Sequence, residues 1–152
     1  MKISEFMKSN VVSIPESSTV REAAAVFAKA HVGLLPIVDE EKKLVGVVGL
    51  RDLLSLVLPD FVNFVADVDF VHDFGAVETS RPSPRILDRS IHSLMKPPIT
   101  VNEDSGLLRT YALMLQHNLH VMPVVSGDGQ LVGIASRVDI GVAIVSTWSL
   151  VK

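Results

Sequence analysis

Short apolar runs separated by polar turns divide the first third of the chain into alternating strands and helices. A β-branched run before Pro15 indicates a strand, and Thr19 with Glu22 has capping-box spacing, which opens a helix. Pro36 lies in the next apolar run and restricts it to a sheet edge or an irregular strand. The pattern predicts a strand at 11–14, a helix at 20–30, strands at 34–38 and 44–48, and a helix at 51–58 that stops near Pro59.

The last third of the chain shows the same order of elements. Its polar turn from Ser126 to Gly129 contains two glycines and indicates a hairpin between the flanking apolar runs. The pattern there predicts a strand at 99–101, a helix at 106–117, strands at 121–125 and 131–135, and a helix at 137–147. The order β-α-β-β-α therefore occurs twice.

The two series are copies of one sequence repeat. When residues 3–57 are set beside 91–144, one gap accounts for the whole alignment: Met7-Lys8 falls on Met95-Lys96 at an offset of 88, and the offset is then 87. Identical pairs at the offset of 87 are Glu16 and Glu103, Ser18 and Ser105, Ala25 and Ala112, Pro36 and Pro123, Val38 and Val125, Leu44-Val45-Gly46 and Leu131-Val132-Gly133, and Asp52 and Asp139. A repeat present twice implies pseudo-twofold symmetry, because a solenoid needs at least three copies.

Each copy carries a sheet face that it cannot cover alone, so two copies are expected to pack sheet to sheet. The fold class predicted is α/β (α+β), with a first domain at 1–58, an insertion at 59–88 and a second domain at 89–152. Apolar residues at helical spacing predict a helix in the insertion after Pro59, whereas 79–85 reads as a loop. Four of the six phenylalanines lie in the insertion, where core cover and a subunit contact are both open interpretations.

Composition limits the function. The 152 residues are 48% hydrophobic and 20% charged, with a net charge of −3, which favours a folded protein and disfavours nucleic-acid binding. There are no cysteines, so thiolate metal sites and cysteine nucleophiles are excluded. No apolar run reaches the length of about 20 residues that spans a bilayer. We therefore expect no membrane partner and a cytoplasmic location.

The last strand-to-helix junction of each copy carries a recognisable heptad. The second copy reads Gly133-Ile134-Ala135-Ser136-Arg137-Val138-Asp139, and the first reads Gly46-Val47-Val48-Gly49-Leu50-Arg51-Asp52. Together with the repeat, these heptads resemble the CBS (cystathionine-β-synthase-like) domain, and the resemblance covers nearly all of the chain outside the insertion. It implies two tandem CBS repeats with an adenine nucleotide bound between them. The first copy departs from the family pattern at Gly49, where a Ser or Thr is expected.

The second heptad suits a phosphorylated ligand. Ser136 lies at the start of a helix, where backbone N–H groups favour phosphate, and Arg137 can meet phosphate oxygens. Asp139 can accept hydrogen bonds from the hydroxyls of a ribose. His120 is similar in position to a family histidine that reaches the phosphate. The spacing of Ser136 and Asp139 is also that of a helix cap, and capping and binding are compatible.

The resemblance further implies contacts to the base from Thr100, Val101 and Met122. In the first copy, the corresponding residues are Val12, Ser13 and Leu35, with Arg51 and Asp52 beside them. Because Gly49 and Gly33 replace Ser136 and His120 in this copy, we expect occupancy mainly at the second site.

The function predicted is a non-catalytic regulatory module that binds AMP, ADP or ATP, with S-adenosylmethionine as a further candidate. No cofactor is required, and no motif supplies a nucleophile with a base, so we expect no enzyme activity. A homodimer is implied by the resemblance, and an unidentified protein partner is a further expectation. The alternative is a purely structural CBS pair with a vestigial cleft. The acidic cluster of the insertion is interpreted as a solvated face and not as a metal site; it comprises Asp67, Asp69, His72, Asp73 and Glu78.

Overall fold

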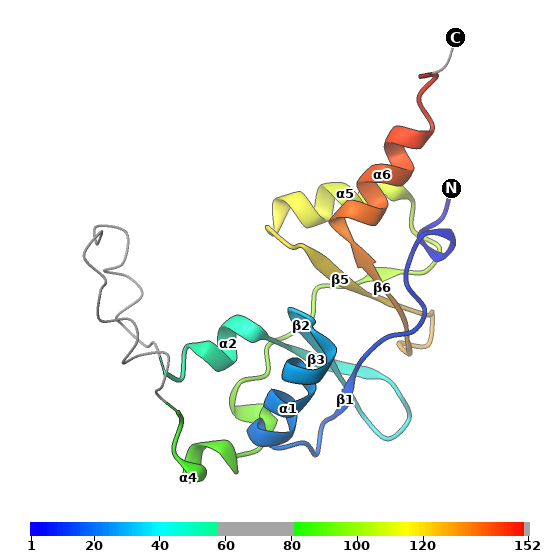
Figure 1. The fold of residues 1–152 in the computed structure, drawn as a ribbon. Helices are drawn as coiled ribbons and strands as arrows, with labels where there is room; N and C mark the ends of the chain where they lie inside the picture. The colour runs from blue at the N-terminus through cyan, green and yellow to red at the C-terminus, as the bar shows by residue number, and fades with distance from the viewer. Residues whose placement is uncertain (58–80, 151–152) are drawn as a thin grey trace, which may run out of the picture.

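The computed structural model describes residues 1–57 and 81–150 and contains two units of the same architecture (Figure 1). The first unit contains a 3-10 turn η1 (Ile3–Glu5), β1 (Ile14–Pro15), α1 (Val20–Ala30), β2 (Leu34–Val38), β3 (Leu44–Gly49) and α2 (Leu50–Leu54). After a short helix α4 (Pro84–Leu87), the second contains η3 (Ile91–Ser93), β4 (Val101–Asn102), α5 (Leu107–Gln116), β5 (Val121–Val125), β6 (Leu131–Ser136) and α6 (Arg137–Ser146).

The predicted repeat and fold class are confirmed. Each unit has a three-stranded sheet, in the order β1-β2-β3 or β4-β5-β6, in which the first pair is parallel and the second antiparallel. Even the irregularities agree, because the register shift between Ile37 and Val38 recurs between Val124 and Val125. The two hairpins meet at their turns, where the Leu44 N–H donates to Gly129 and the Leu131 N–H donates to Lys42.

Pro36 lies in a central strand, which the sequence alone does not favour. Its partner in β3 is Val47, but the N–H and C=O of Val47 bond to Lys96 on the other side. The parallel ladder with β1 begins only at Ile37. No neighbouring strand therefore requires a donor from Pro36, and Pro123 occupies the same position in β5 opposite Ile134, which bonds to Lys8.

The beginnings of the two repeats are exchanged between the units. Residues 1–8 pack on the second sheet, where Ile3 is fully buried in the core and Lys8 bridges to Ile134. In turn, Ile91 is fully buried in the first core, and Lys96 bridges to Val47. In Figure 1 the N-terminal segment accordingly runs beside β6 of the second unit. Each packing unit is therefore built from two separate stretches of the sequence.

The bounds of four predicted segments were wrong. The run 11–14 pairs only at Ile14–Pro15, and 99–101 only from Val101, because the preceding residues cross between the units and have no ladder partner. The 79–85 loop ends in a helix, because Ser83 accepts a hydrogen bond from the Ile86 N–H and Pro84 occupies the first turn. The predicted helix at 51–58 is regular only as α2, over Leu50–Leu54.

The rest of the predicted insertion lies outside the described residues, including its helix, its phenylalanines and its acidic cluster. In the described parts of the chain, no helix is both long and apolar enough to cross a bilayer.

Candidate functional site

A cavity of about 550 Å³ lies between the two units and is lined by both. Gly33 and the β3–α2 junction line it from the first unit, whereas the loop before β5 lines it from the second. Its charged and polar side chains are Arg51, Asp52, Lys96, Asn118 and His120. Its volume falls within the range of roughly 300–1,000 Å³ that small-molecule sites occupy. The cavity thus brings His120 together with Arg51 and Asp52, which the sequence assigned to different sites.

Asp52 is the acidic group of this cavity, and both of its oxygens are engaged. Its Oδ2 accepts from the Gly49 N–H at 2.8 Å, and its Oδ1 lies 2.6 Å from Nζ of Lys96. The side chain of Asp52 is only 15% exposed. Gly49 itself returns no capping bond, because it has no side chain. A carboxylate oxygen can accept more than one hydrogen bond, so Asp52 retains acceptor capacity toward the cavity.

Asp139 occupies the equivalent position in the second unit but is held more loosely. Its Oδ2 lies 3.9 Å from Nζ of Lys8, and its side chain is 36% exposed. Ser136 is the N-cap of α6, and its Oγ accepts from the Asp139 N–H at 3.0 Å. The capping interpretation of this motif is therefore correct, and the hydroxyl can still donate its own hydrogen.

Arg137 points to protein carbonyls in this structure. Its Nε donates to the carbonyl of Leu119 at 3.0 Å, and a guanidinium nitrogen lies 3.5 Å from the carbonyl of Met114. Its backbone N–H also donates to the carbonyl of His120. Arg137 thus ties the end of α5 to the start of α6, whereas Arg51 lines the cavity and forms no ion pair with the described residues.

The residues predicted to contact a base divide into two groups. Leu35, Val101 and Met122 are at most 5% exposed and belong to the two apolar cores. Because side chains alternate along a strand, it is their neighbours Leu34 and Val121 that face the cavity. Leu35 and Met122 are therefore one position out of register with the cavity face. Because β2 and β5 are apolar at every position, no contrast in the sequence distinguished Leu34 and Val121 from them.

The remaining predicted residues lie on the segments that cross between the units. Strand register pairs Ile14 with Ile37 and Val101 with Val124, so the offset of 87 already holds at Ile14. The counterpart of Thr100 is therefore Ser13, and the counterpart of Val12 is Ile99. Val12 and Ile99 are 40% and 38% exposed, respectively, and Ile99 lines the cavity, which the sequence analysis did not predict.

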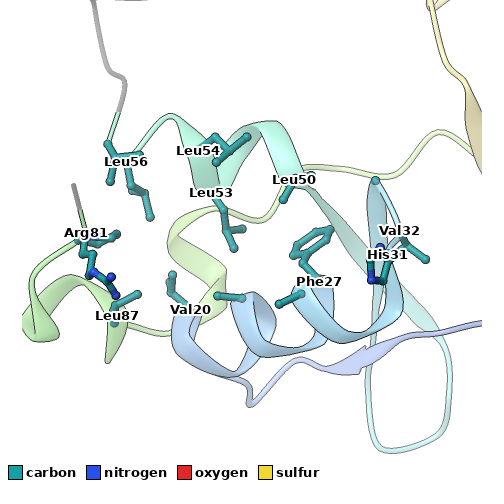
Figure 2. Close-up of a pocket in the computed structure, with 15 residues that line it drawn as sticks. Val20, Phe27, His31, Val32, Leu50, Leu53, Leu54, Leu56, Arg81 and Leu87 are labelled. Carbon is teal, nitrogen blue, oxygen red and sulfur yellow. The ribbon is translucent and has the colours of Figure 1, made fainter. Parts of the chain in front are cut away.

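A larger hollow of about 780 Å³ lies between α1, α2 and residues 81–87 (Figure 2). Figure 2 shows that its walls are almost wholly apolar, with Phe27 and Leu53 pointing toward each other across it and only His31 and Arg81 adding polar atoms. Val57 and Arg81 border it and adjoin residues outside the described ranges. It offers no carboxylate for a ribose and is not the candidate site.

Two β-α-β-β-α units with exchanged N-terminal segments, and a cavity of charged and apolar side chains between them, define a tandem-repeat α/β module. The family model for the CBS domain matches residues 3–59 and 89–146. The chain belongs to the CBS domain family.

Similarity to known proteins extends over most of the chain. It is 29% identical over 142 residues to the CBS domain-containing protein CBSX1, chloroplastic, of Arabidopsis thaliana, covering 89% of this chain and 60% of that protein. The chain thus spans about three fifths of the length of that relative. Among solved structures, CBSX2 of Arabidopsis thaliana in complex with AMP matches with a TM-score of 0.71 and 25% identity, covering 95% of this chain and 96% of that one. The CBS domain pair of MJ0100, in complex with 5-methylthioadenosine and S-adenosyl-L-methionine, shares the fold, with a TM-score of 0.66 and 21% identity over 97% of this chain and 98% of that one.

Proposed function

We propose that the chain is a non-catalytic regulatory module that binds an adenine nucleotide in the cavity around Asp52. The observation that carries the proposal is the composition of this cavity, in which one carboxylate lies beside two cationic side chains and an imidazole. In this arrangement Asp52 accepts from the ribose hydroxyls, while Lys96, Arg51 and His120 face the phosphate.

An apolar surface for the base is also present. Leu34, Ile99 and Val121 line the same cavity and can hold a planar ring between the two units. Because β2 and the loop before β5 belong to different units, a base placed here contacts both. The AMP complex of CBSX2, which is similar over nearly the whole chain, supports an adenine nucleotide as the ligand class.

The proposed main site lies at the first heptad, whereas the sequence alone favoured the second. Of the phosphate-binding groups expected at the second site, Arg137 is bonded to two carbonyls and His120 lies in the Asp52 cavity. The site at Asp139 remains a candidate, with Ser136 as its hydroxyl donor. Mutation of the two aspartates distinguishes the sites.

Regulation requires that the nucleotide bind two arrangements of the protein with different affinity. The walls of the cavity come from both units, which supports such a coupling. A ligand that contacts both units favours the arrangement in which the cavity is closed. We propose that this difference is transmitted to a partner, which is either a second copy of the chain or another protein.

The experiment is isothermal titration calorimetry of the wild type, Asp52→Asn and Asp139→Asn with AMP, ADP and ATP. Asparagine keeps an oxygen for the Gly49 N–H but removes the charge, so we expect the variant to fold. We expect Asp52→Asn to weaken binding about tenfold or more, because hydrogen bonds to charged groups contribute about 1.5–3 kcal/mol.

The other results are also informative. Loss of binding in Asp139→Asn alone would assign the nucleotide to the second site, as the sequence suggested. If no nucleotide bound the wild type at millimolar concentration, the module would be a structural pair with a vestigial cleft.

A further inference from the structure

In both units the aspartate of the heptad is faced by a lysine that belongs to the other repeat in sequence. Lys96 pairs with Asp52 at 2.6 Å, and Lys8 lies 3.9 Å from Asp139. The lysines are themselves equivalent in the repeat, at the offset of 88. The exchange of N-terminal segments brings them to the aspartates, because Lys8 belongs to the first repeat in sequence and Lys96 to the second.

The backbone of Lys96 is fixed at the wall of the cavity. Its N–H donates to Val47 at 2.8 Å and its carbonyl accepts from Val47 at 3.0 Å. The side chain is 65% exposed, so only Asp52 restrains its ammonium group within the described residues. The backbone of Lys96 is therefore fixed, whereas its exposed ammonium group can exchange Asp52 for another acceptor in the cavity.

Two kinds of ligand affect this ion pair differently. The hydroxyls of a neutral nucleoside compete with Lys96 for Oδ1 of Asp52 and offer the ammonium group nothing in return. A nucleotide offers its hydroxyls to Asp52 and its phosphate to Lys96. Both groups of the ion pair therefore gain a new partner when the pair opens. Arg51 and His120 line the same cavity and favour the same anionic group.

We propose that Lys96 is a specificity-determining residue that makes the cavity select phosphorylated adenosine over neutral or cationic adenosine derivatives. The inference rests on the proposed function and names the ligand class of that same site. Lys96 holds Asp52 in the structure described here and pairs with the phosphate when a nucleotide is bound.

The second unit has an equivalent lysine–aspartate pair with a longer distance. Lys8 is farther from its aspartate, and by the repeat Val138 stands where the first cavity has Arg51, while Ser136 stands where it has Gly49. Lys8 is therefore the matched control, since it is the equivalent lysine, with a longer contact to its aspartate and no neighbouring arginine at the position of Arg51.

The test is calorimetric titration of the wild type, Lys96→Gln and Lys8→Gln with AMP, adenosine and S-adenosylmethionine. In Lys96→Gln we expect AMP to bind about tenfold to a hundredfold more weakly, as the loss of a charge-assisted contact predicts. We expect adenosine to bind equally or more tightly, since its competitor for Asp52 is gone, and S-adenosylmethionine to bind more tightly. Lys8→Gln should change the ratio of AMP to adenosine affinity by less than about threefold. The affinity for AMP should also depend more steeply on salt in the wild type than in Lys96→Gln.

The outcomes separate the two proposals. If the wild type binds AMP but Lys96→Gln keeps the same ratio of AMP to adenosine affinity, the role of Lys96 is overturned and the nucleotide site stands. An equal loss of selectivity in Lys8→Gln would also overturn it. If the wild type binds none of the three compounds, the proposed function fails and the role of Lys96 fails with it. Lys96 is largely exposed, and a thermal unfolding curve like that of the wild type verifies that the variant is folded.

Discussion

At the scale of single residues, two glycines show how the repeats fit onto each other. A Cβ added at Gly46 would lie 2.3 Å from Cγ of Met95, and one added at Gly133 would lie 2.3 Å from Sδ of Met7. Both methionines come from the exchanged segments. The first residue of each heptad is therefore a glycine because a methionine side chain packs directly on its Cα, and not because the backbone requires an unusual conformation.

The substitution Gly46→Ala should destabilise the fold by about 1–3 kcal/mol, as overpacking of a filled core does. Met95 must move, and the Lys96 carbonyl is only 3.1 Å from the added atom, so the segment that positions Lys96 is displaced as well. The measurement is the free energy of unfolding in urea. Gly127→Ala is the control, since no atom lies within 4 Å of its added Cβ. Equal stability of the two variants would contradict the packing explanation.

At the scale of elements, the start of α1 is determined by its capping box. The Glu22 N–H donates to Oγ1 of Thr19 at 3.1 Å, and the Thr19 N–H donates to Oε1 of Glu22 at 3.4 Å. In the second unit Gly106 is the N-cap of α5 and provides no side-chain cap. Two copies of one element therefore begin at equivalent positions for different local reasons.

We expect Thr19→Ala to lower the free energy of unfolding by about 1 kcal/mol, because one backbone donor loses its acceptor. Thr19→Ser keeps the hydroxyl and should remain within about 0.5 kcal/mol of the wild type. Chemical denaturation monitored by circular dichroism measures both. A loss in Thr19→Ser as large as in Thr19→Ala would show that the methyl group, and not the cap, matters.

At the scale of the whole molecule, exchange of the N-terminal segments makes each unit depend on the other half of the sequence. Ile3 and Ile91 are both fully buried, each in the core of the unit that the rest of its repeat does not form. Truncation of either residue removes apolar contacts from the opposite unit.

Hydrogen exchange measured by mass spectrometry can detect this dependence. Ile3→Ala should cost about 2–5 kcal/mol and reduce protection first in β5 and β6, whereas Ile91→Ala should act first on β2 and β3. The two variants are controls for each other. Loss of protection in the same strands for both would contradict the exchanged packing.

The outer face of α6 is the surface that we propose for the expected homodimer. Val138, Val142 and Val145 are exposed at spacings of four and three residues, and so form one apolar stripe on the helix. Leu108 and Leu115 are exposed on the adjacent helix α5. An apolar stripe of this kind is typical of a surface that a partner covers.

We therefore expect Val142→Glu to convert a dimer into a monomer, because it places a charge in the centre of the stripe. The molar mass measured by light scattering should fall by about half at equal concentration. Ser17→Glu adds the same charge in an exposed turn away from these helices and should leave the mass unchanged. A wild type that is monomeric at high micromolar concentration would contradict the prediction.

The sequence by itself determined the repeat, the order of the elements and the family, because apolar periodicity and the heptads are local or directly comparable features. The helix α1, whose start is marked by the local capping box of Thr19 and Glu22, was predicted to the residue. The motif residues Ser136 and Asp139 were correctly placed at the start of a helix for the same reason.

The tertiary structure alone decided which unit each segment joins and which residues share a cavity. Lys96 approaches Asp52, and His120 lies in the same cavity, only because residues far apart in the chain are packed across two sheets. A sequence pattern records which side of a strand is apolar, but two sides of β2 and β5 are buried, one in a core and one against the cavity. Burial on both sides removes the contrast between polar and apolar positions, so only the packed structure shows that Leu34 and Val121, and not Leu35 and Met122, face the cavity between the units.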